Sequence, residues 1–341
     1  MVTVYFATNR DPNDYQTPTD FGKDFSRSGL TDLRFGKAQV TGRKLDRYKL
    51  TVAPENLQVP LAAAQRNDLS GQVLGSTAIF QEVRKRMVTK KCDLMVSIHG
   101  FNYSFKEALN RTAQLTKFYG DRDMVWFLFS WPSNGSMLPF KAYASDRSDA
   151  RASGEALGRG LMKLAHFLRG IPPQQYCGQK LHIMAHSMGN YALRHAVQAI
   201  RASGRQPMRR LFEEVVLMAP DEDEDAFELD HKLKPLPEMA ARVSIYCNPR
   251  DRALMISDFT KGNPDRLGAA GPRNAKVLPD KVSVVNVKRA VADDDDIQCH
   301  QYYKENKQVR DDVLALLDGK DPDELKTRVY NPEKNIYWLK K

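Results

Sequence analysis

Long apolar runs are absent from this sequence. No stretch approaches the roughly 20 consecutive apolar residues that a membrane-spanning helix requires, and the mean hydropathy is −0.54. The opening MVTVYFATNR alternates like a strand and lacks the basic start, apolar run and small-residue cleavage site of a secretory signal. Taking Met1 as the native start, we expect no membrane span and a cytoplasmic location.

Cysteines are few: the chain has four, at Cys92, Cys177, Cys247 and Cys299. They are scattered without the close pairs that a zinc site or a redox-active disulfide requires. We therefore expect free structural thiols. Cys299 directly precedes His300, so a nucleophilic Cys299 is an alternative, although adjacency in sequence does not bring a thiol and an imidazole together in space.

A dense basic tract is also missing, although 52 Lys and Arg residues against 42 Asp and Glu residues give a formal net charge of +10. No zinc finger, RNA-recognition signature or stripe of aromatic and basic residues accompanies the charge, so we expect a solvated basic surface and no nucleic-acid partner. The acidic runs 221–225 and 293–296 lack the spacing of a calcium loop. We expect solvated loop charge in both runs and no metal.

From Asp93 onward, short apolar runs rich in β-branched and aromatic residues alternate with longer helical patterns. Each apolar run is continuous, as in strands buried on both faces of a parallel sheet. The α/β class is therefore predicted, with a mostly parallel central sheet and helices on both faces. The predicted strands are 93–98, 124–131, 180–185, 214–218, 242–247 and 281–287, and the predicted helices are 105–119, 145–169, 188–203 and 302–317.

No internal repeat or low-complexity linker divides the chain, so we expect one domain over residues 1–320. Within it, residues 1–92 are predicted to form an antiparallel edge of the sheet and residues 93–320 the catalytic core. The edge contains strands near 3–7 and 47–52 and a helix near 77–88. Residues 321–341 are predicted to form an extended tail, pinned by the apolar side chains of 337–339.

The sharpest local signal is LHIMAHSMGN, residues 181–190, in which an apolar strand leads into Ser187 and straight on into a helix. A tight strand-to-helix turn of this kind exposes a nucleophilic serine, and small residues two places before and after it let the backbone pass. Here these are Ala185 and Gly189. We predict that Ser187 is the nucleophile.

A serine hydroxyl needs a base to accept its proton, and a carboxylate to orient that base. Enzymes with this strand-turn-helix arrangement place the acid after the second strand beyond the serine and the histidine after the last strand. Position therefore selects His300 as the base and Asp251 as the acid. Asp258, Asp221 and Asp223 are the alternatives for the acid.

Two backbone N–H groups are expected to stabilise the oxyanion. One is that of Met188, the residue after the serine, and the other is that of Phe101, because the strand 93–98 runs into a His-Gly turn at His99. We expect the His99 ring to pack and bond within its own loop. The residues predicted to line the substrate pocket are Asn102, Trp131, Ser133 and Met137.

A set of ordered blocks covers most of the chain: FATNR, SIHGFN, FSWPS, AHSMGN, MAPDED, NPRDRAL and the late HQYY. Together they resemble a bacterial α/β-hydrolase family of largely unassigned function and, more broadly, esterases and lipases. The resemblance implies the α/β-hydrolase fold. It also implies that Ser187, Asp251 and His300 match the triad positions of that family.

The function expected from these residues is that of a serine carboxylesterase, which cleaves short- to medium-chain esters through an acyl-enzyme without a cofactor. Nothing in the sequence resembles a long apolar lid for lipid interfaces. Thioesterase or amidase chemistry at the same residues is an alternative. A binding module of the same fold is another, although such modules usually lose a member of the triad. The partner expected is a small ester, and the oligomeric state is left open.

Overall fold

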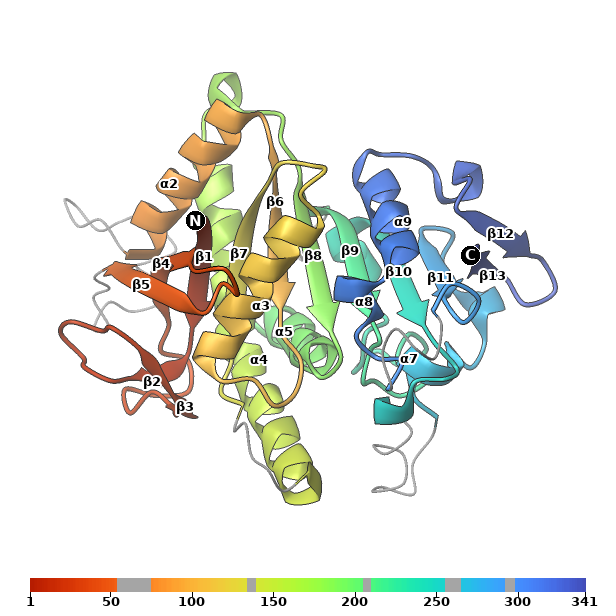
Figure 1. The fold of residues 1–341 in the computed structure, drawn as a ribbon, viewed down its shortest axis with the longest axis horizontal. Coiled ribbons are helices and arrows are strands. Elements are labelled where there is room, and N and C mark those ends of the chain that lie inside the picture. The colour runs from red at the N-terminus through yellow and green to blue at the C-terminus, as the bar shows by residue number, and fades with distance from the viewer. Residues whose placement is uncertain (54–74, 134–138, 205–209, 255–264, 292–297) are drawn as a thin grey trace.

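The computed structural model describes residues 1–53, 75–133, 139–204, 210–254, 265–291 and 298–341. Within these residues one 11-stranded sheet crosses the whole molecule (Figure 1). Its strands, in spatial order, are β12 (Arg328–Asn331), β13 (Ile336–Leu339), β11 (Val282–Asn286), β10 (Ala240–Cys247), β9 (Phe212–Met218), β8 (Leu181–His186), β6 (Asp93–Ile98), β7 (Met124–Ser130), β1 (Val2–Thr8), β4 (Arg34–Thr41) and β5 (Arg47–Ala53).

The centre of the sheet is parallel. Every neighbouring pair from β13 through β11, β10, β9, β8, β6 and β7 to β1 runs in the same direction, whereas β12, β4 and β5 pair antiparallel at the two edges. All residues of β6, β8 and β11 are buried, because helices cover both faces of the central strands. The carboxyl ends of these strands therefore meet along one edge of the sheet.

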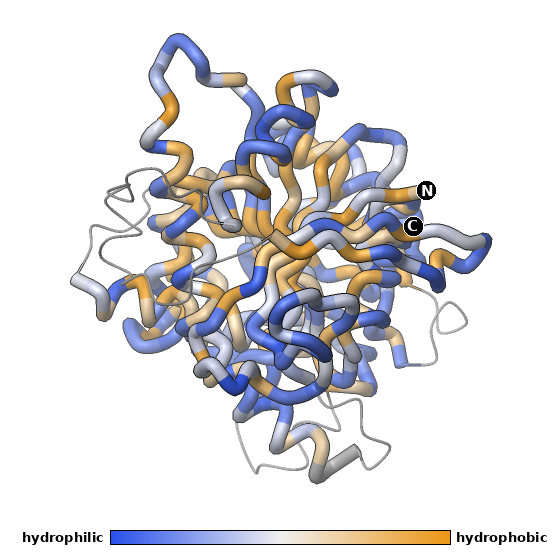
Figure 2. The backbone as a smooth tube through the Cα atoms, turned by 90° about the vertical axis from the view of Figure 1, so that its left-hand side faces the viewer, coloured by the Kyte–Doolittle hydropathy of each residue, from blue (hydrophilic) through white to orange (hydrophobic). Residues whose placement is uncertain are grey.

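Helices cover the two faces of the sheet in separate groups (Figure 1). One face packs against α2 (Gly75–Lys90), α4 (Pro139–Arg169) and α5 (Gly189–Ala202), and the other packs against α3 (Phe105–Phe118), α8 (Tyr302–Glu305) and α9 (Lys307–Leu317). Hydrophobic segments gather along the strands in the middle, and polar segments lie outside (Figure 2). The smaller elements are β2 (Arg10–Pro12), β3 (Phe21–Phe25), α7 (Leu267–Ala270) and the 3₁₀ turns Pro173–Gln175, Leu236–Met239, Ala275–Val277 and Pro322–Glu324.

Local sequence explains where two of these helices begin. Ser104 starts α3 with a capping box, in which its Oγ accepts from the Glu107 N–H and its own N–H donates to the Glu107 carboxylate. Asn306 has an extended conformation, and its side chain accepts from the Val309 N–H. The helix predicted over 302–317 is therefore split at Asn306 into α8 and α9.

The six strands predicted after Asp93 are all present, with ends shifted by at most two residues. β4, which lies between β1 and β5, was not predicted. Its Gly36 weakens the strand signal, yet a Cβ at this position would lie 2.6 Å from the Phe6 ring and 2.7 Å from the Thr51 carbonyl oxygen. Glycine is thus required there because the neighbouring strand and the Phe6 ring leave no room.

The C-terminal segment differs from the predicted extended tail. β12 and β13 form a hairpin, and β13 pairs parallel with β11, so residues 328–339 extend the main sheet. The guanidinium of Arg328 donates to Asp312 of α9 at 2.8 Å, and the Tyr246 hydroxyl donates to the same carboxylate at 2.6 Å. This buried ion pair fastens the hairpin to both α9 and β10.

The described residues can be compared with two expectations, that the chain has no membrane span and that its cysteines are free thiols. No helix there is long and apolar enough to cross a membrane. All four cysteines are free thiols, as predicted, and Cys299 is buried.

We expect Arg328→Met to lower the free energy of unfolding by about 3–5 kcal/mol, because it leaves the Asp312 carboxylate buried beside a neutral side chain. Urea unfolding followed by circular dichroism measures the change. Lys326→Met, at an exposed position of the same segment, is the matched control. Equal stability of the two variants would show that the Arg328–Asp312 ion pair does not stabilise the fold.

Candidate active site

Ser187 lies at the carboxyl end of β8 in a backbone conformation that side chains rarely adopt. Its φ is 52°, and holding a non-glycine residue there costs on the order of 1–3 kcal/mol. The surrounding hydrogen bonds enforce it: the Ser187 N–H donates to the Met218 carbonyl at 2.9 Å, and the Asn190 side chain donates to the Ser187 carbonyl at 3.0 Å. α5 begins two residues later, at Gly189.

Glycines let a second loop approach this turn. We call residues 99–103, which follow β6, the His99 loop. A Cβ at Gly189 would lie 2.6 Å from the His99 carbonyl oxygen, and a Cβ at Gly100 would lie 2.9 Å from the Ser187 Cβ. The turn and the His99 loop are therefore in direct backbone contact, and Ala185, which is fully buried, adds only a methyl group.

His300 and Asp251 form a close pair beside this turn. Asp251 follows β10 and is fully buried, and its Oδ2 lies 2.6 Å from Nδ1 of His300. A carboxylate at Nδ1 fixes the imidazole in the tautomer that leaves Nε2 to accept a proton. The second oxygen, Oδ1, accepts from the Leu254 N–H at 3.0 Å, which orients the carboxylate.

His186, the residue before Ser187, packs against His300 and so keeps it next to the serine. The centroids of the His186 and His300 rings are 4.7 Å apart, and the His186 ring stacks on Tyr303 at 4.1 Å. Burial, together with the charge of His300, keeps the pKa of His186 well below its ordinary value. His186 is therefore an uncharged ring that packs between the turn at Ser187 and the segment that carries His300 and Tyr303. On the other side, the Asn248 side chain donates to the Cys299 carbonyl at 3.2 Å.

His99 and Trp131 form the base of the His99 loop. Their rings stack with centroids 5.0 Å apart, the Trp131 N–H donates to Nε2 of His99 at 3.2 Å, and the indole N–H donates to the His99 carbonyl at 2.9 Å. Burial, with the charge of Arg10, lowers the pKa of His99 to about 3. The ring therefore bonds within the structure as a neutral group, as expected.

Ser133 and Asp146 hold the far end of the same loop. The Asn102 N–H donates to the Ser133 hydroxyl at 2.8 Å, and that hydroxyl donates in turn to the Asp146 carboxylate. Within the described residues, the N–H groups of Phe101 and Met188 donate no hydrogen bond to the protein. Two backbone donors thus remain, one at the residue after Ser187 and one in the His99 loop.

The four residues predicted to line the pocket have different places. Asn102 is exposed beside the site. Trp131 and Ser133 are fully buried, and their bonds to the His99 loop favour support of that loop over contact with substrate. Met137 lies outside the described residues.

Arg10 is a site residue that the sequence analysis missed. Its buried guanidinium donates to the Tyr103 carbonyl at 2.6 Å and to the Ser130 hydroxyl at 2.9 Å, so it connects β2 to the His99 loop and to the end of β7. The Thr8 hydroxyl donates to the Ser130 carbonyl at 2.7 Å. The sequence signal for Arg10 was the block FATNR, of which it is the last residue, but the residues of that block were given no individual role.

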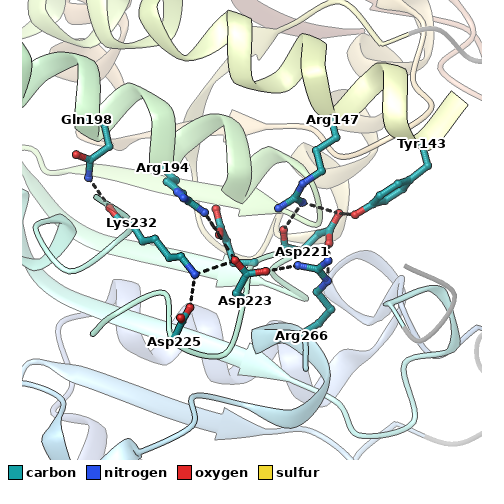
Figure 3. Close-up of polar contacts among 10 residues, drawn as sticks. Tyr143, Arg147, Arg194, Gln198, Asp221, Asp223, Asp225, Lys232 and Arg266 are labelled. Atoms are coloured by element: carbon teal, nitrogen blue, oxygen red, sulfur yellow. Dashed lines mark hydrogen bonds and ion pairs between the residues drawn. The ribbon is translucent and has the colours of Figure 1, made fainter. Parts of the chain in front are cut away.

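An acid cluster follows β9 and meets the first turns of α4 (Figure 3). The Asp221 N–H donates to the Ser187 carbonyl at 3.2 Å, and its carboxylate accepts from the Tyr143 hydroxyl at 2.6 Å and lies 3.6 Å from Arg147. The other members of the cluster are Glu222, Asp223 and Asp225, and its cations are Arg147, Arg194, Lys232 and Arg266.

These ion pairs bear on two expectations, namely which acid pairs with His300 and whether the charges of 221–225 are solvated. Asp223 accepts from Arg266 at 2.5 Å and from Lys232 at 2.8 Å, and Asp221 is bound to α4, whereas His300 pairs with Asp251. The geometry thus favours Asp251 over these two alternatives for the acid, and Asp258 lies outside the described residues. The expectation of solvated charge is wrong for four of the five acids of 221–225, because Asp221, Glu222, Asp223 and Asp225 are buried or half-buried and paired with cations. The run 293–296 lies outside the described residues.

Comparisons with known proteins show the family of this chain. Residues 76–317 match the family described as alpha/beta hydrolase of unknown function (DUF900). The uncharacterized protein alr1448 of Nostoc sp. (strain PCC 7120) is 23% identical over 275 residues, which are 73% of this chain and 65% of that protein. The chain thus spans less than two thirds of that relative. A Trichoderma reesei cutinase in complex with a C11Y4 phosphonate inhibitor has 12% identity and a TM-score of 0.24 over 48% of this chain and 69% of the cutinase.

We expect Gly100→Ala to reduce the reactivity of the Ser187 hydroxyl toward a fluorophosphonate by about 100-fold, because the new methyl group displaces the serine or its loop. The labelling rate, followed by mass spectrometry, is the measurement. Gly160→Ala is the matched control, since its added Cβ lies 3.7 Å from the nearest neighbouring atom. Unchanged labelling of the Gly100 variant would mean that the turn at Ser187 and the His99 loop are not in contact.

His99 makes stability depend on pH with a defined sign. Its pKa is about 3 in the folded protein against 6.5 for the free group. Between these two pKa values the unfolded chain binds a proton that the folded chain does not. The contribution of His99 to the free energy of unfolding therefore falls by up to about 1.4 kcal/mol per pH unit as the pH drops from 6.5 toward 3. Urea unfolding should show His99→Gln destabilised by about 2 kcal/mol less near pH 5 than near pH 7.5, relative to wild type. The same difference at both pH values would contradict a buried neutral ring.

Proposed function

Because the chain belongs to the α/β-hydrolase family DUF900, we propose that it is a serine carboxylesterase in which Ser187 is the nucleophile, His300 the general base and Asp251 the orienting acid. The substrate is a carboxylic ester with a short or medium acyl chain. The observation that carries the proposal is the 2.6 Å contact between Asp251 and His300 beside a serine held at a φ of 52°.

The first half of the reaction forms an acyl-enzyme. Nε2 of His300 accepts the hydroxyl proton while Oγ of Ser187 bonds to the acyl carbon, and the carbonyl oxygen becomes an oxyanion. The N–H groups of Met188 and Phe101, which donate to no protein group within the described residues, hold this oxyanion. Loss of one such donor typically costs about 3–4 kcal/mol of transition-state stabilisation. The bond to the alcohol oxygen then breaks, and His300 returns the proton to the departing alcohol.

Hydrolysis of the acyl-enzyme uses the same groups. His300 accepts a proton from water as the water oxygen bonds to the acyl carbon, and it gives this proton to Oγ of Ser187 as the acid leaves. Asp251 stays ionised throughout and stabilises the imidazolium that forms twice per turnover. Protein groups supply every proton transfer, so the proposed mechanism uses no cofactor.

The proposed mechanism is tested by incubating the protein with a fluorophosphonate probe, locating the modified residue by mass spectrometry and assaying p-nitrophenyl esters of increasing acyl length. Labelling at Ser187 together with ester turnover supports the proposal, and the series ranks acyl length. Matched thioester and amide substrates distinguish the related chemistries. A folded protein that is not labelled would overturn the proposal in favour of a binding module.

We expect Ser187→Ala to remove turnover and Asp251→Asn to lower kcat by about 10⁴-fold, because an amide at this position stabilises the wrong tautomer of His300. Asp223→Asn is the matched control for the acid, since Asp223 pairs with Arg266 and Lys232. Full activity of Asp251→Asn with loss of activity in Asp223→Asn would reassign the acid. Circular dichroism verifies that each variant is folded.

A further inference from the structure

A cavity of about 380 Å³ lies at the opposite edge of the sheet from Ser187. It is lined by Leu94 and Leu181, the second residue of β6 and the first of β8, whereas Ser187 follows the last residue of β8. The strand arrows in Figure 1 point away from this edge, at the upper end of the view. At about 3.3 Å per residue, the length of β8 separates the cavity from Ser187 by about 20 Å. The cavity is therefore distinct from the proposed acyl site.

The inner wall of the cavity is apolar. Phe80, Val83 and Met87 come from one face of α2, and Leu164, Phe167 and Leu168 come from the last turns of α4. The volume falls within the range of small-molecule sites, about 300–1,000 Å³. Such a wall has the size and chemistry to enclose an alkyl chain.

The mouth of the cavity is basic. Its lining includes the cations Arg84, Arg169, Lys180 and Arg210, with Glu213 as the one acid of the described lining residues. Lys180 is paired with Glu213 at 2.8 Å. Arg169 and Arg210 are exposed, and their guanidinium groups have no ion pair or hydrogen bond within the described part of the chain. The positive charge at the mouth is therefore largely uncompensated.

Arg84 supplies a separate observation. One of its terminal nitrogens donates to the Gln175 carbonyl, but its Nε is buried and has no hydrogen-bond partner among the described residues. A buried donor without a partner carries a free-energy cost. Guanidinium groups also match carboxylate and phosphate oxygens in geometry.

We propose that this cavity binds a single-chain aliphatic anion, with its alkyl chain against the wall formed by α2 and α4 and its head group on Arg169 and Arg210. The apolar wall selects the chain, and the unpaired cations select the negative head. A carboxylate and a phosphate head share this chemistry. Binding here does not depend on the esterase activity proposed for Ser187.

Cys177 provides a reporter that is specific for this cavity. It is one of the lining residues, and it is half-buried while the other three cysteines are buried. A ligand in the cavity should therefore slow the reaction of Cys177 with a thiol reagent, and mass spectrometry assigns the modified residue.

The experiment measures the rate of Cys177 modification as laurate is added below its micelle concentration. A sample whose Ser187 has first been blocked with a fluorophosphonate excludes effects of laurate bound near the serine. If Ser187 cannot be blocked, the proposed function fails while this measurement still stands. We expect laurate to slow the modification at least about fivefold at saturation, and dodecyl phosphate, compared at equal concentration, to show which head group binds more tightly.

Chain and charge are tested separately. Acetate lacks the chain, dodecanol lacks the charge and dodecyltrimethylammonium reverses it, so none of them should protect Cys177. The double variant Arg169→Gln/Arg210→Gln should bind laurate at least about tenfold more weakly, because both charge contacts are lost. Arg43→Gln/Arg47→Gln, which removes the same charge from exposed positions elsewhere, is the matched control and should bind as wild type.

Each of three outcomes would overturn the proposal. The first is equal protection by laurate and dodecyltrimethylammonium, which would mean that the cavity selects only the chain. The second is unchanged laurate affinity in the Arg169/Arg210 variant, and the third concerns Ala165. Ala165→Leu, which adds volume to the cavity wall, should weaken laurate more than octanoate, and equal effects on both would place the chain elsewhere.

Discussion

The left-handed backbone at Ser187 is the constraint on which the rest of the site depends. It turns the chain from β8 into α5 within two residues, and it can persist only if neighbouring groups hold it. Met218, Asn190 and Asp221 bond to its backbone or are bonded by it, from β9, from α5 and from the acid cluster. Because β6, β8, β10 and β11 are parallel, the same edge also receives the His99 loop, Asp251 and His300. One strained residue and one parallel sheet thus account for the whole arrangement.

Around Ser187, several buried side chains hold the loops of the site in place. Arg10, Trp131, Ser133 and His186 touch loops that carry the proposed chemical groups, and each is buried in a network of hydrogen bonds or ring contacts. Such networks stabilise a fold only when hydrogen bonds within them offset the free-energy cost of removing their polar groups from water. The neutral state of His99 and His186 fits this role, because a charged ring would repel Arg10 or His300.

The sequence was sufficient for the class of fold and for the central strands, since strands buried on both faces leave continuous apolar runs. It was also sufficient to select Ser187, His300 and Asp251 as candidates, because their order follows the order of parallel strands. β4 and the hairpin β12–β13 were missed, since Gly36 interrupts β4 and since β12 and β13 have only four residues each, too few to give a continuous apolar run. Trp131 and Ser133 were assigned to the pocket because their place in the chain was visible but the direction of their side chains was not. The ion pairs of Asp221 and Asp223 join residues far apart in sequence, which no local pattern reveals.

The position of β1 has a consequence for how this protein can be trimmed. β1 pairs with β7 inside the sheet, and the adjoining Arg10 reaches the Tyr103 carbonyl, yet both lie before residue 76, where the family match begins. A fragment cut to the matched segment would lose a neighbour of β7 and expose its edge to other chains. It would also remove the guanidinium that supports the His99 loop. The segment by which the chain is recognised is therefore smaller than the unit that builds its site.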